Sequence, residues 1–249
     1  MTAVSLLEER FTGSLRLFGR NGFLKLQASH VAVAGVGGVG SPCAEALCRA
    51  GVGELTLIDA DTIERSNLNR QVHALESTVG EPKVEAMARR LKDINPDLKV
   101  HALQQRIDGT TLKDFLATLP YYCVEAIDDL KAKALLDHGL YHSKRSFVVA
   151  GGAGGRIDPA KLHLSDIARA KGDQLIAHLR TVLRRDYGFP HGGKKFNILC
   201  TYSEETPRYA EENGHKVFGA LMGVTACAGL MLASEIIRRI TEENGGKEV

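Results

Sequence analysis

The sequence predicts an α/β protein built on a mostly parallel β-sheet with helices on both faces. From about residue 30 to residue 152, short apolar runs rich in β-branched residues alternate with amphipathic segments. The apolar runs lack the polar alternation of a half-exposed strand, which indicates strands that are buried on both faces of a parallel sheet. The expected strands cover residues 30–35, 54–61, 99–107, 121–129 and 146–152, and the expected helices cover residues 41–51, 81–96 and 131–144.

Further segments extend this core at both ends. The first thirty residues form an expected helical N-terminal arm, because Leu6, Phe11 and Leu15 begin an irregular apolar face. After Gly151 the expected elements are a helix over 166–187, a loop over 188–195, a strand over 196–203 and an apolar helix over 217–237. No linker divides the chain, so we expect one domain over residues 1–249, with a core of about 28–158 and a C-terminal extension over 159–249.

Composition excludes several classes of protein. A hydrophobic fraction of 44%, a charged fraction of 25% and a formal net charge of +2 are ordinary for a globular domain, so any nucleic-acid site must be a local patch. The five cysteines contain no C-x-x-C pair and the nine histidines show no metal-ligand spacing, so we assign them neither a disulfide framework nor a metal site. The acidic start of the chain argues against an export signal and favours a cytoplasmic protein.

The apolar stretch over residues 217–237 approaches the length of a transmembrane helix. Its glycine, alanine, serine and threonine residues make it only mildly hydrophobic. A helix of this kind is typical of a protein core, so we expect it to pack against the sheet and we expect no stable membrane insertion.

A glycine cluster stands between the first strand and the first helix of the expected core. Its members are Gly35, Gly37, Gly38 and Gly40, in the pattern G-x-G-G-x-G. Glycine lets a backbone approach a phosphate closely, and the N-terminus of the following helix offers unpaired N–H groups. Asp59 ends the next strand, where a carboxylate can bind ribose hydroxyls, so the fold class is Rossmann-like. These residues alone favour a nicotinamide or flavin enzyme, and a glycine turn without a ligand is the alternative.

Polar residues after this strand favour a triphosphate instead. They are Asp61, Asn67, Arg70, Lys83 and Asp128. Arg70 offers paired donors, Lys83 a point charge and Asn67 a neutral donor, which suits β- and γ-phosphates and a pyrophosphate leaving group. Asp128 ends the fourth strand, where its carboxylate can bind Mg²⁺. Taken singly, Arg70 and Lys83 have an alternative interpretation as surface charges, and Asp128 has one as a helix N-cap.

The order of these motifs resembles the ubiquitin-activating superfamily, which includes bacterial enzymes that adenylate the molybdopterin- and thiamine-pathway sulfur carriers. The motifs are G-x-G-G-x-G, a strand ending in D-x-D, S-N-L-x-R-Q and V-G-x-P-K, and the resemblance covers residues 11 to about 158. It implies an enzyme that uses ATP to activate a carboxylate as an acyl-adenylate. It also implies that Gly38 contacts phosphates and that Asp59 binds ribose. The residues implied to be catalytic are Arg70, Lys83 and Asp128, with Asn67 helping to hold the triphosphate and Asp128 assisting the metal.

Three features separate the chain from the sulfur-carrier activators. It lacks their two C-x-x-C zinc pairs, it carries the run GGAGGRIDP over residues 151–159, and it has a basic segment over residues 180–195. The run over 151–159, with RFTGSLRLFG near the start and FNILCTYSEE later, resembles the tRNA threonylcarbamoyladenosine dehydratases. This resemblance implies that ATP adenylates the carboxylate of a modified adenosine beside the tRNA anticodon. A neighbouring nitrogen then closes a ring, and AMP and pyrophosphate are released.

The basic segment and one cysteine each have two interpretations. The segment offers tRNA phosphate contacts or is simply a solvated helix face; its cations are Arg180, Arg184, Arg185, Lys194 and Lys195. Cys200 closes an expected strand, and in the wider superfamily a cysteine can accept the acyl group as a thioester. A buried structural cysteine is the favoured interpretation of Cys200.

Other functions fit parts of the same sequence. The first is an adenylyltransferase that activates the C-terminal glycine of a small sulfur-carrier protein. The second is an NAD-dependent oxidoreductase, and the third is a catalytically silent nucleotide-binding scaffold. The expected cofactors are ATP and Mg²⁺ and the expected substrate is tRNA. Because the superfamily usually pairs such domains, we expect a homodimer, and a sulfur-transfer protein is a candidate partner.

Overall fold

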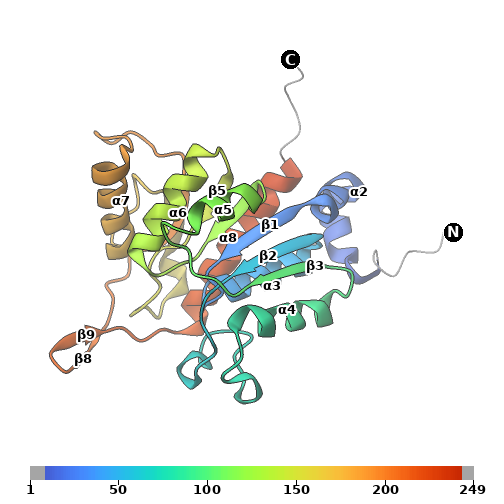
Figure 1. The fold of residues 1–249 in the computed structure, drawn as a ribbon, viewed down its shortest axis with the longest axis horizontal. Coiled ribbons are helices and arrows are strands. Elements are labelled where there is room, and N and C mark those ends of the chain that lie inside the picture. The colour runs from blue at the N-terminus through green and yellow to red at the C-terminus, as the bar shows by residue number, and fades with distance from the viewer. Residues whose placement is uncertain (1–8, 243–249) are drawn as a thin grey trace.

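The computed structural model describes residues 9–242 of the chain. Its main sheet contains β1 (His30–Ala34), β2 (Glu54–Ile58), β3 (Lys99–Leu103), β4 (Tyr122–Glu125), β5 (Ser146–Val149), β6 (Leu162–Asp166) and β7 (Leu199–Ser203). These seven strands lie in the order β3-β2-β1-β4-β5-β7-β6. Figure 1 shows β3, β2 and β1 side by side. Every neighbouring pair is parallel except β6 and β7, so the predicted mostly parallel sheet is confirmed.

Helices cover both faces of this sheet, as predicted. They are α2 (Thr12–Ala28), α3 (Gly40–Ala50), α4 (Lys83–Ile94), α5 (Leu112–Thr118), α6 (Leu130–His142), α7 (Gln174–Tyr187) and α8 (Met222–Glu242). One buried apolar cluster takes side chains from α3, α4 and α8, and the other takes them from α5, α6 and α7. Val31 and Val33 of β1 belong to the first cluster, and Ala32 and Ala34 belong to the second. Burial on both faces explains why β1 is a continuous apolar run.

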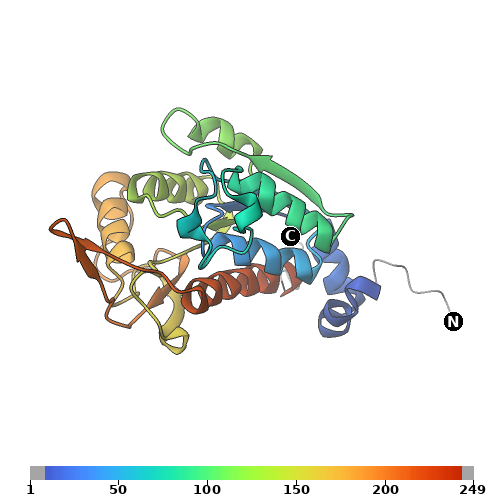
Figure 2. The same cartoon turned by 90° about the horizontal axis from the view of Figure 1, so that it is seen from below.

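The long apolar helix is α8, which begins at Met222 rather than at the predicted residue 217. It lies beside α3 in Figure 2, where the two are drawn in red and blue. The approach is close, because a Cβ added to Gly229 of α8 would lie 2.2 Å from the carbonyl oxygen of Val39. Among residues 9–242, no helix combines the length and the hydropathy needed to cross a membrane.

Several elements differ from the sequence-based expectation. The helix predicted over residues 166–187 is wrong in its first part, because β6 runs to Asp166 and α7 begins only at Gln174. The Asp166 carboxylate accepts hydrogen bonds from the backbone N–H groups of Phe196 (3.0 Å) and Asn197 (2.7 Å), so it ties a loop together instead of starting a helix. The short helix α5 was not expected. The hairpin of β8 (Ala210–Glu212) and β9 (His215–Val217) was also missed, although its turn, Asn213-Gly214, is a strong hairpin signal.

The N-terminal arm packs on its own chain over its described part. The rings of Phe11 and Phe23 lie 5.8 Å apart, and a Cβ on Gly51, at the end of α3, would lie 2.7 Å from the Phe23 ring. Lys25 donates to the carbonyl oxygen of Thr241 at 3.2 Å, which fixes α2 against α8. These contacts bury Phe11, Phe23 and Leu26 within one chain, whereas Leu17 and Leu24 stay exposed. The expected homodimer therefore stays a prediction, and residues 1–8 lie outside the described residues.

Candidate nucleotide-binding site

A cavity of about 860 Å³ opens at the carboxyl edge of the sheet. Gly35 follows β1 and Asp59 follows β2, while Asp128 and Gly151 stand in the segments after β4 and β5, and all four line the cavity. The chain continues from β1 to β2 on one side and later returns to β4 on the other side of β1. The cavity therefore lies at the topological switch point, where open α/β sheets bind ligands.

The structure brings nearly all of the predicted nucleotide residues to this cavity. The lining includes Gly35, Gly37, Gly38, Asp59, Asp61, Asn67, Arg70, Lys83 and Asp128. Gly40 is the exception, since it is buried at the start of α3 and does not line the cavity. A Cβ on Gly40 would lie 1.8 Å from the carbonyl oxygen of Gly35, so glycine is needed there for the turn itself.

Two glycines of the loop explain its shape. Gly35 has a φ of 86°, and a Cβ there would lie 2.5 Å from the carbonyl oxygen of Ala126, so a side chain is excluded by both conformation and space. Gly38 faces the cavity, where a Cβ would lie 3.2 Å from Arg70 Cγ and 3.3 Å from Thr225 Cβ. The loop thus leaves its backbone accessible on the cavity side, directly before the N-terminus of α3.

Asp59 connects the end of β2 to the glycine loop. Its Oδ2 accepts a hydrogen bond from the Val36 N–H at 2.7 Å, and its Oδ1 accepts one from the Asp61 N–H at 2.9 Å. A carboxylate has about four acceptor positions, so both oxygens retain capacity for a further donor such as a ribose hydroxyl. Asp59 therefore orders the loop and also offers an acceptor to the cavity.

Cationic and amide side chains also line the cavity. Lys83 is the first residue of α4 and is 7% exposed, and its Nζ lies 2.8 Å from Asp61 Oδ2. Arg70 donates from Nη1 to the carbonyl oxygen of Ser66 (2.7 Å), which sets the direction of its guanidinium. Asn67 is buried and accepts from the Glu64 N–H at 3.1 Å, which holds the short helical turn over residues 65–67. These side chains thus present two fixed cations and one amide to the cavity.

Asp128 is exposed and lines the cavity, and its neighbour Asp129 is the residue that caps α6. Asp129 Oδ1 accepts from the Ala132 N–H at 2.8 Å, so the alternative interpretation of Asp128 as the helix N-cap is wrong. A Mg²⁺ ion is typically held by one or two carboxylates together with substrate phosphates. Asp128 fits that donor set as a protein ligand facing the cavity.

A buried ion pair holds the backbone directly before Asp128 in place. Lys133 pairs with Glu125, and both side chains are fully buried. Glu125 Oε1 accepts from the Ile127 N–H at 2.7 Å, and Lys133 Nζ donates to the Ile127 carbonyl oxygen at 3.0 Å. Burial raises the pKa of Glu125, against the opposing effect of Lys133. The pair therefore fixes both backbone polar groups of the residue that precedes Asp128.

The sequence analysis missed several residues of the site. Gln71 lines the cavity beside Gly37, and its Oε1 is buried with no hydrogen-bond partner in the part of the chain that the structure describes. Its position directly after Arg70 was the signal that could have found it. Leu175 and Thr225 also line the cavity, but they come from α7 and α8, far along the chain. No local spacing connects them to the glycine loop.

The basic segment over residues 180–195 is not one patch. Arg180 donates from Nη1 to the carbonyl oxygens of Ile167 (2.9 Å) and Ala170 (3.0 Å). Arg184 donates to the carbonyl oxygen of Pro190 at 3.0 Å and lies over a buried phenylalanine ring. These two arginines hold the protein's own loops. The exposed cations of the segment are Arg185, Lys194 and Lys195, with Arg185 paired to Asp186, and none of the five predicted cations lines the cavity.

Cys200 lies in β7 and is fully buried. Burial raises the pKa of its thiol, so almost no thiolate forms at neutral pH. The side chain does not line the cavity. Its environment matches the interpretation as a structural cysteine and offers no route for an acyl group to reach its sulfur.

Sequence comparison assigns the chain to a family, since the model of the ThiF family matches residues 10–248. The chain belongs to the ThiF family. Among its relatives, the tRNA threonylcarbamoyladenosine dehydratase of Haemophilus influenzae is 36% identical over 98% of this chain and 97% of that protein. The E. coli sulfur carrier protein ThiS adenylyltransferase is 43% identical, but the match covers only 39% of each chain.

A solved structure has the same fold over almost the whole chain. The E. coli tRNA N6-threonylcarbamoyladenosine dehydratase in complex with AMP superposes with a TM-score of 0.91, at 35% identity, over 98% of both chains. The same E. coli enzyme in complex with ATP superposes with a TM-score of 0.90. The likeness therefore includes the C-terminal extension.

Proposed function

We propose that this ThiF-family chain is an ATP-dependent dehydratase that cyclises threonylcarbamoyladenosine beside the anticodon of tRNA. The reaction passes through an acyl-adenylate and releases AMP and pyrophosphate. The observation that carries the proposal is the cavity that Arg70, Lys83 and Asn67 line together with a glycine loop at the switch point of the sheet. The near-full-length likeness to tRNA threonylcarbamoyladenosine dehydratases supports the substrate.

The cavity suits adenylation of a carboxylate. The loop at Gly37 and Gly38 and the N-terminus of α3 receive phosphate oxygens, and Asp59 accepts hydrogen bonds from the ribose. A substrate carboxylate oxygen attacks the α-phosphorus, and the bond to the pyrophosphate oxygen breaks. Arg70 and Lys83 stabilise the negative charge that gathers on this leaving group. Mg²⁺, held through Asp128, supplies further charge neutralisation when bound.

Ring closure follows without an enzyme nucleophile. A nitrogen of the same modified nucleoside attacks the activated acyl carbon, and AMP leaves with the oxygen that the carboxylate has lost. The reacting groups belong to one molecule, so the protein mainly needs to hold them in a reactive orientation. The burial of Cys200 agrees with this route, because it keeps the one thiol of β7 away from the cavity.

The tRNA-facing surface adjoins the cavity at the segment that carries the β8–β9 hairpin. Phe218 packs on Gly154, which lines the cavity, and the Gly155 N–H donates to the Gly219 carbonyl oxygen at 2.7 Å. Tyr209 and Phe218 are exposed aromatic side chains 6.3 Å apart, and Lys216 Nζ lies 4.2 Å from the centre of the Tyr209 ring. Unpaired RNA bases stack on such rings and phosphates pair with such cations, so this surface suits an anticodon loop.

One incubation tests the proposal directly. The protein is mixed with ATP, Mg²⁺ and tRNA that contains threonylcarbamoyladenosine, and the nucleosides are then analysed by mass spectrometry. Loss of one water from that nucleoside, dependent on ATP, is the expected result. Pyrophosphate exchange measured in parallel tests the alternative of a sulfur-carrier adenylyltransferase. Exchange that depends on a diglycine carrier protein and not on tRNA would contradict the proposal. A higher affinity for NAD than for ATP would favour an oxidoreductase.

A further inference from the structure

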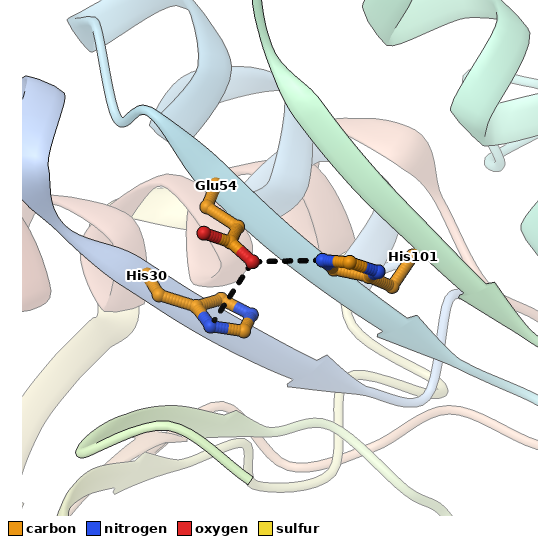
Figure 3. Close-up of side chains that lie close together, drawn as sticks. All are labelled: His30, Glu54 and His101. Atoms are coloured by element: carbon orange, nitrogen blue, oxygen red, sulfur yellow. Dashed lines mark hydrogen bonds and ion pairs between the residues drawn. The ribbon is translucent and has the colours of Figure 1, made fainter. Parts of the chain in front are cut away.

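Three side chains that can bind a metal meet on the sheet, away from the nucleotide cavity. His30 is on β1, Glu54 on β2 and His101 on β3 (Figure 3). The Glu54 carboxylate lies between the two rings, with Oε1 2.7 Å from His101 Nε2 and 3.6 Å from His30 Nδ1. One ligand atom from each residue lies within 4.8 Å of the others.

Strand register brings these residues together. His30 pairs with Glu54 in the β1–β2 ladder, and Thr56 pairs with His101 in the β2–β3 ladder. Glu54 and Thr56 are two residues apart on one strand and therefore share a face. The three side chains stand on neighbouring strands of a regular sheet, so their backbone positions are fixed before any ion binds. Their side chains are 28%, 29% and 51% exposed for His30, Glu54 and His101, which leaves the cluster open to solvent.

A hydrogen bond behind His30 orients its ring. His30 Nε2 lies 2.8 Å from the hydroxyl oxygen of Thr56, which is buried. When Nε2–H donates to this hydroxyl, Nδ1 is unprotonated and directs its lone pair toward Glu54. A metal-binding histidine typically makes such a bond with its other nitrogen, and the bond fixes the tautomer and the ring orientation. A lone pair that faces a carboxylate is unfavourable unless a cation lies between them.

We propose that His30, Glu54 and His101 form a binding site for a divalent d-block cation, with Zn²⁺ the foremost candidate. Zinc binds imidazole nitrogen and carboxylate oxygen at about 2.0–2.2 Å, so neighbouring ligand atoms of a tetrahedral site lie about 3.3 Å apart. The separations of 2.7 Å and 3.6 Å fall on either side of that value, and small side-chain rotations reach it. A water molecule completes a fourth position. Imidazole and carboxylate together suit Zn²⁺ better than Mg²⁺ or Ca²⁺, which prefer oxygen ligands alone.

The charge around the cluster permits this cation. Glu54 supplies one negative charge, and the nearest cation along the strands is Lys99, which pairs with Glu54 in the β2–β3 register and is exposed. An exposed lysine can turn its ammonium group into solvent when an ion binds. The cluster lies at the amino ends of β1 and β2, about 16 Å along β1 from the glycine loop at the opposite edge. Metal binding here therefore links three strands without touching the adenylation chemistry.

The competing explanation is an ion pair of Glu54 with a protonated His101, which needs no metal.

To test the proposal, metal-stripped full-length protein is titrated with Zn²⁺ by calorimetry and with Co²⁺ by visible absorption. We expect one equivalent of Zn²⁺ per chain at this site, tetrahedral Co²⁺ bands, and a Zn²⁺-dependent rise of several degrees in melting temperature. Each of His30→Ala, His101→Ala and Glu54→Gln weakens Zn²⁺ binding at least tenfold and removes the Co²⁺ bands.

A matched control is available on β6. His163 also faces a glutamate across strands, with Nε2 3.7 Å from Glu204 Oε2. His163→Ala keeps the bound equivalent, and so does Asp128→Asn, which removes the carboxylate proposed for Mg²⁺. Unchanged Zn²⁺ affinity in His30→Ala and His101→Ala, or loss of the equivalent only in the controls, overturns the proposal. Adenylation activity and zinc binding are measured in separate assays. A protein that binds zinc at this site but does not adenylate its substrate would therefore contradict the proposed function and not the proposed metal site.

Discussion

Lys133 Nζ donates a hydrogen bond to the carbonyl oxygen of Ile127 at 3.0 Å, so a fully buried cation holds the residue directly before Asp128. The same lysine pairs with Glu125, which in turn accepts from the Ile127 N–H at 2.7 Å. Removing the lysine alone would leave a buried carboxylate without its counter-ion. The pair thus supports the cavity wall, and removal of one partner without the other should cost much stability.

We expect Lys133→Met to lower the free energy of unfolding by about 3–5 kcal/mol, because Glu125 then becomes an unpaired buried charge. Chemical denaturation measures this loss. Lys133→Met combined with Glu125→Gln should recover part of it, since neither partner is then charged. Asp137→Asn is the control. The Asp137 carboxyl is also fully buried, but its two oxygens have no hydrogen-bond partner among the described residues, so Asp137→Asn breaks no ion pair and should cost much less. Equal losses in both single variants would contradict the ion-pair explanation.

Lys83 should contribute mainly to the chemical step. Its ammonium group lies against Asp61 at the cavity wall, where it is placed to stabilise the leaving pyrophosphate. Removing one such charge stabilisation typically costs about 10²–10³ in kcat, so Lys83→Ala should lower the rate of pyrophosphate exchange by that factor. Arg65→Ala removes a comparable cation whose partner is the exposed Glu76, outside the cavity. Exchange in Arg65→Ala should stay near the wild-type rate, and an equal fall in both variants would argue against a specific role for Lys83.

Asp59 should affect nucleotide binding through the glycine loop as well as through the ribose. Asp59→Ala removes the acceptor for the Val36 N–H, and hydrogen bonds to charged groups contribute about 1.5–3 kcal/mol. ATP affinity measured by calorimetry should therefore fall about 10- to 100-fold. Asp59→Asn keeps one oxygen acceptor and should fall less. If Asp59→Asn binds ATP as weakly as Asp59→Ala, the loop contact to Val36 is not the important one.

How far the sequence predicts this site depends on how local its parts are. The glycine loop and Asp59 were predicted because they directly follow expected strands, and Arg70 and Lys83 because they stand in short local motifs. Thr225 reaches the cavity from α8, and only tertiary packing decides which face of that helix meets Gly38. The basic segment over residues 180–195 was predicted as one tRNA-binding patch because its cations are close in sequence. Sequence spacing does not reveal that Arg180 instead donates to a backbone carbonyl of its own chain.

The histidine cluster was missed because metal-ligand spacing was judged along the chain. His101 and Glu54 are 47 residues apart in sequence, and only the parallel register of β2 and β3 brings them into contact. The order of the strands, unlike their positions, does not follow from hydrophobic patterning. The helix predicted to begin at Asp166 was wrong because a tertiary contact outweighs the local sequence pattern. The Asp166 carboxylate accepts two hydrogen bonds from the backbone of residues 196 and 197, which override the local helical pattern.

His73 should make stability depend on pH. It is buried beside Lys83 and Arg90, and burial lowers the pKa of its imidazole to about 4. The folded pKa lies below the ordinary value of about 6.5, so this contribution is complete above pH 6.5 and is lost as pH falls toward 4. The free energy of unfolding should therefore fall by up to about 1.4 kcal/mol per pH unit in that window because of His73. His73→Gln should lack this part of the slope, while the exposed His178→Gln should retain it; parallel curves for all three proteins would contradict the assignment.

Replacement of Tyr209 should weaken the binding of tRNA and not the binding of ATP. Stacking of a base on an aromatic side chain contributes about 1–3 kcal/mol, so Tyr209→Ala should raise the KM for tRNA about 10- to 100-fold and leave the KM for ATP unchanged. Lys216→Ala should weaken tRNA binding and flatten its salt dependence, because one phosphate contact is lost. Lys195→Ala is the matched control on the exposed loop after α7, which does not adjoin the cavity. A larger tRNA defect in Lys195→Ala than in Lys216→Ala would move the docking surface from the β8–β9 hairpin to the segment over residues 180–195.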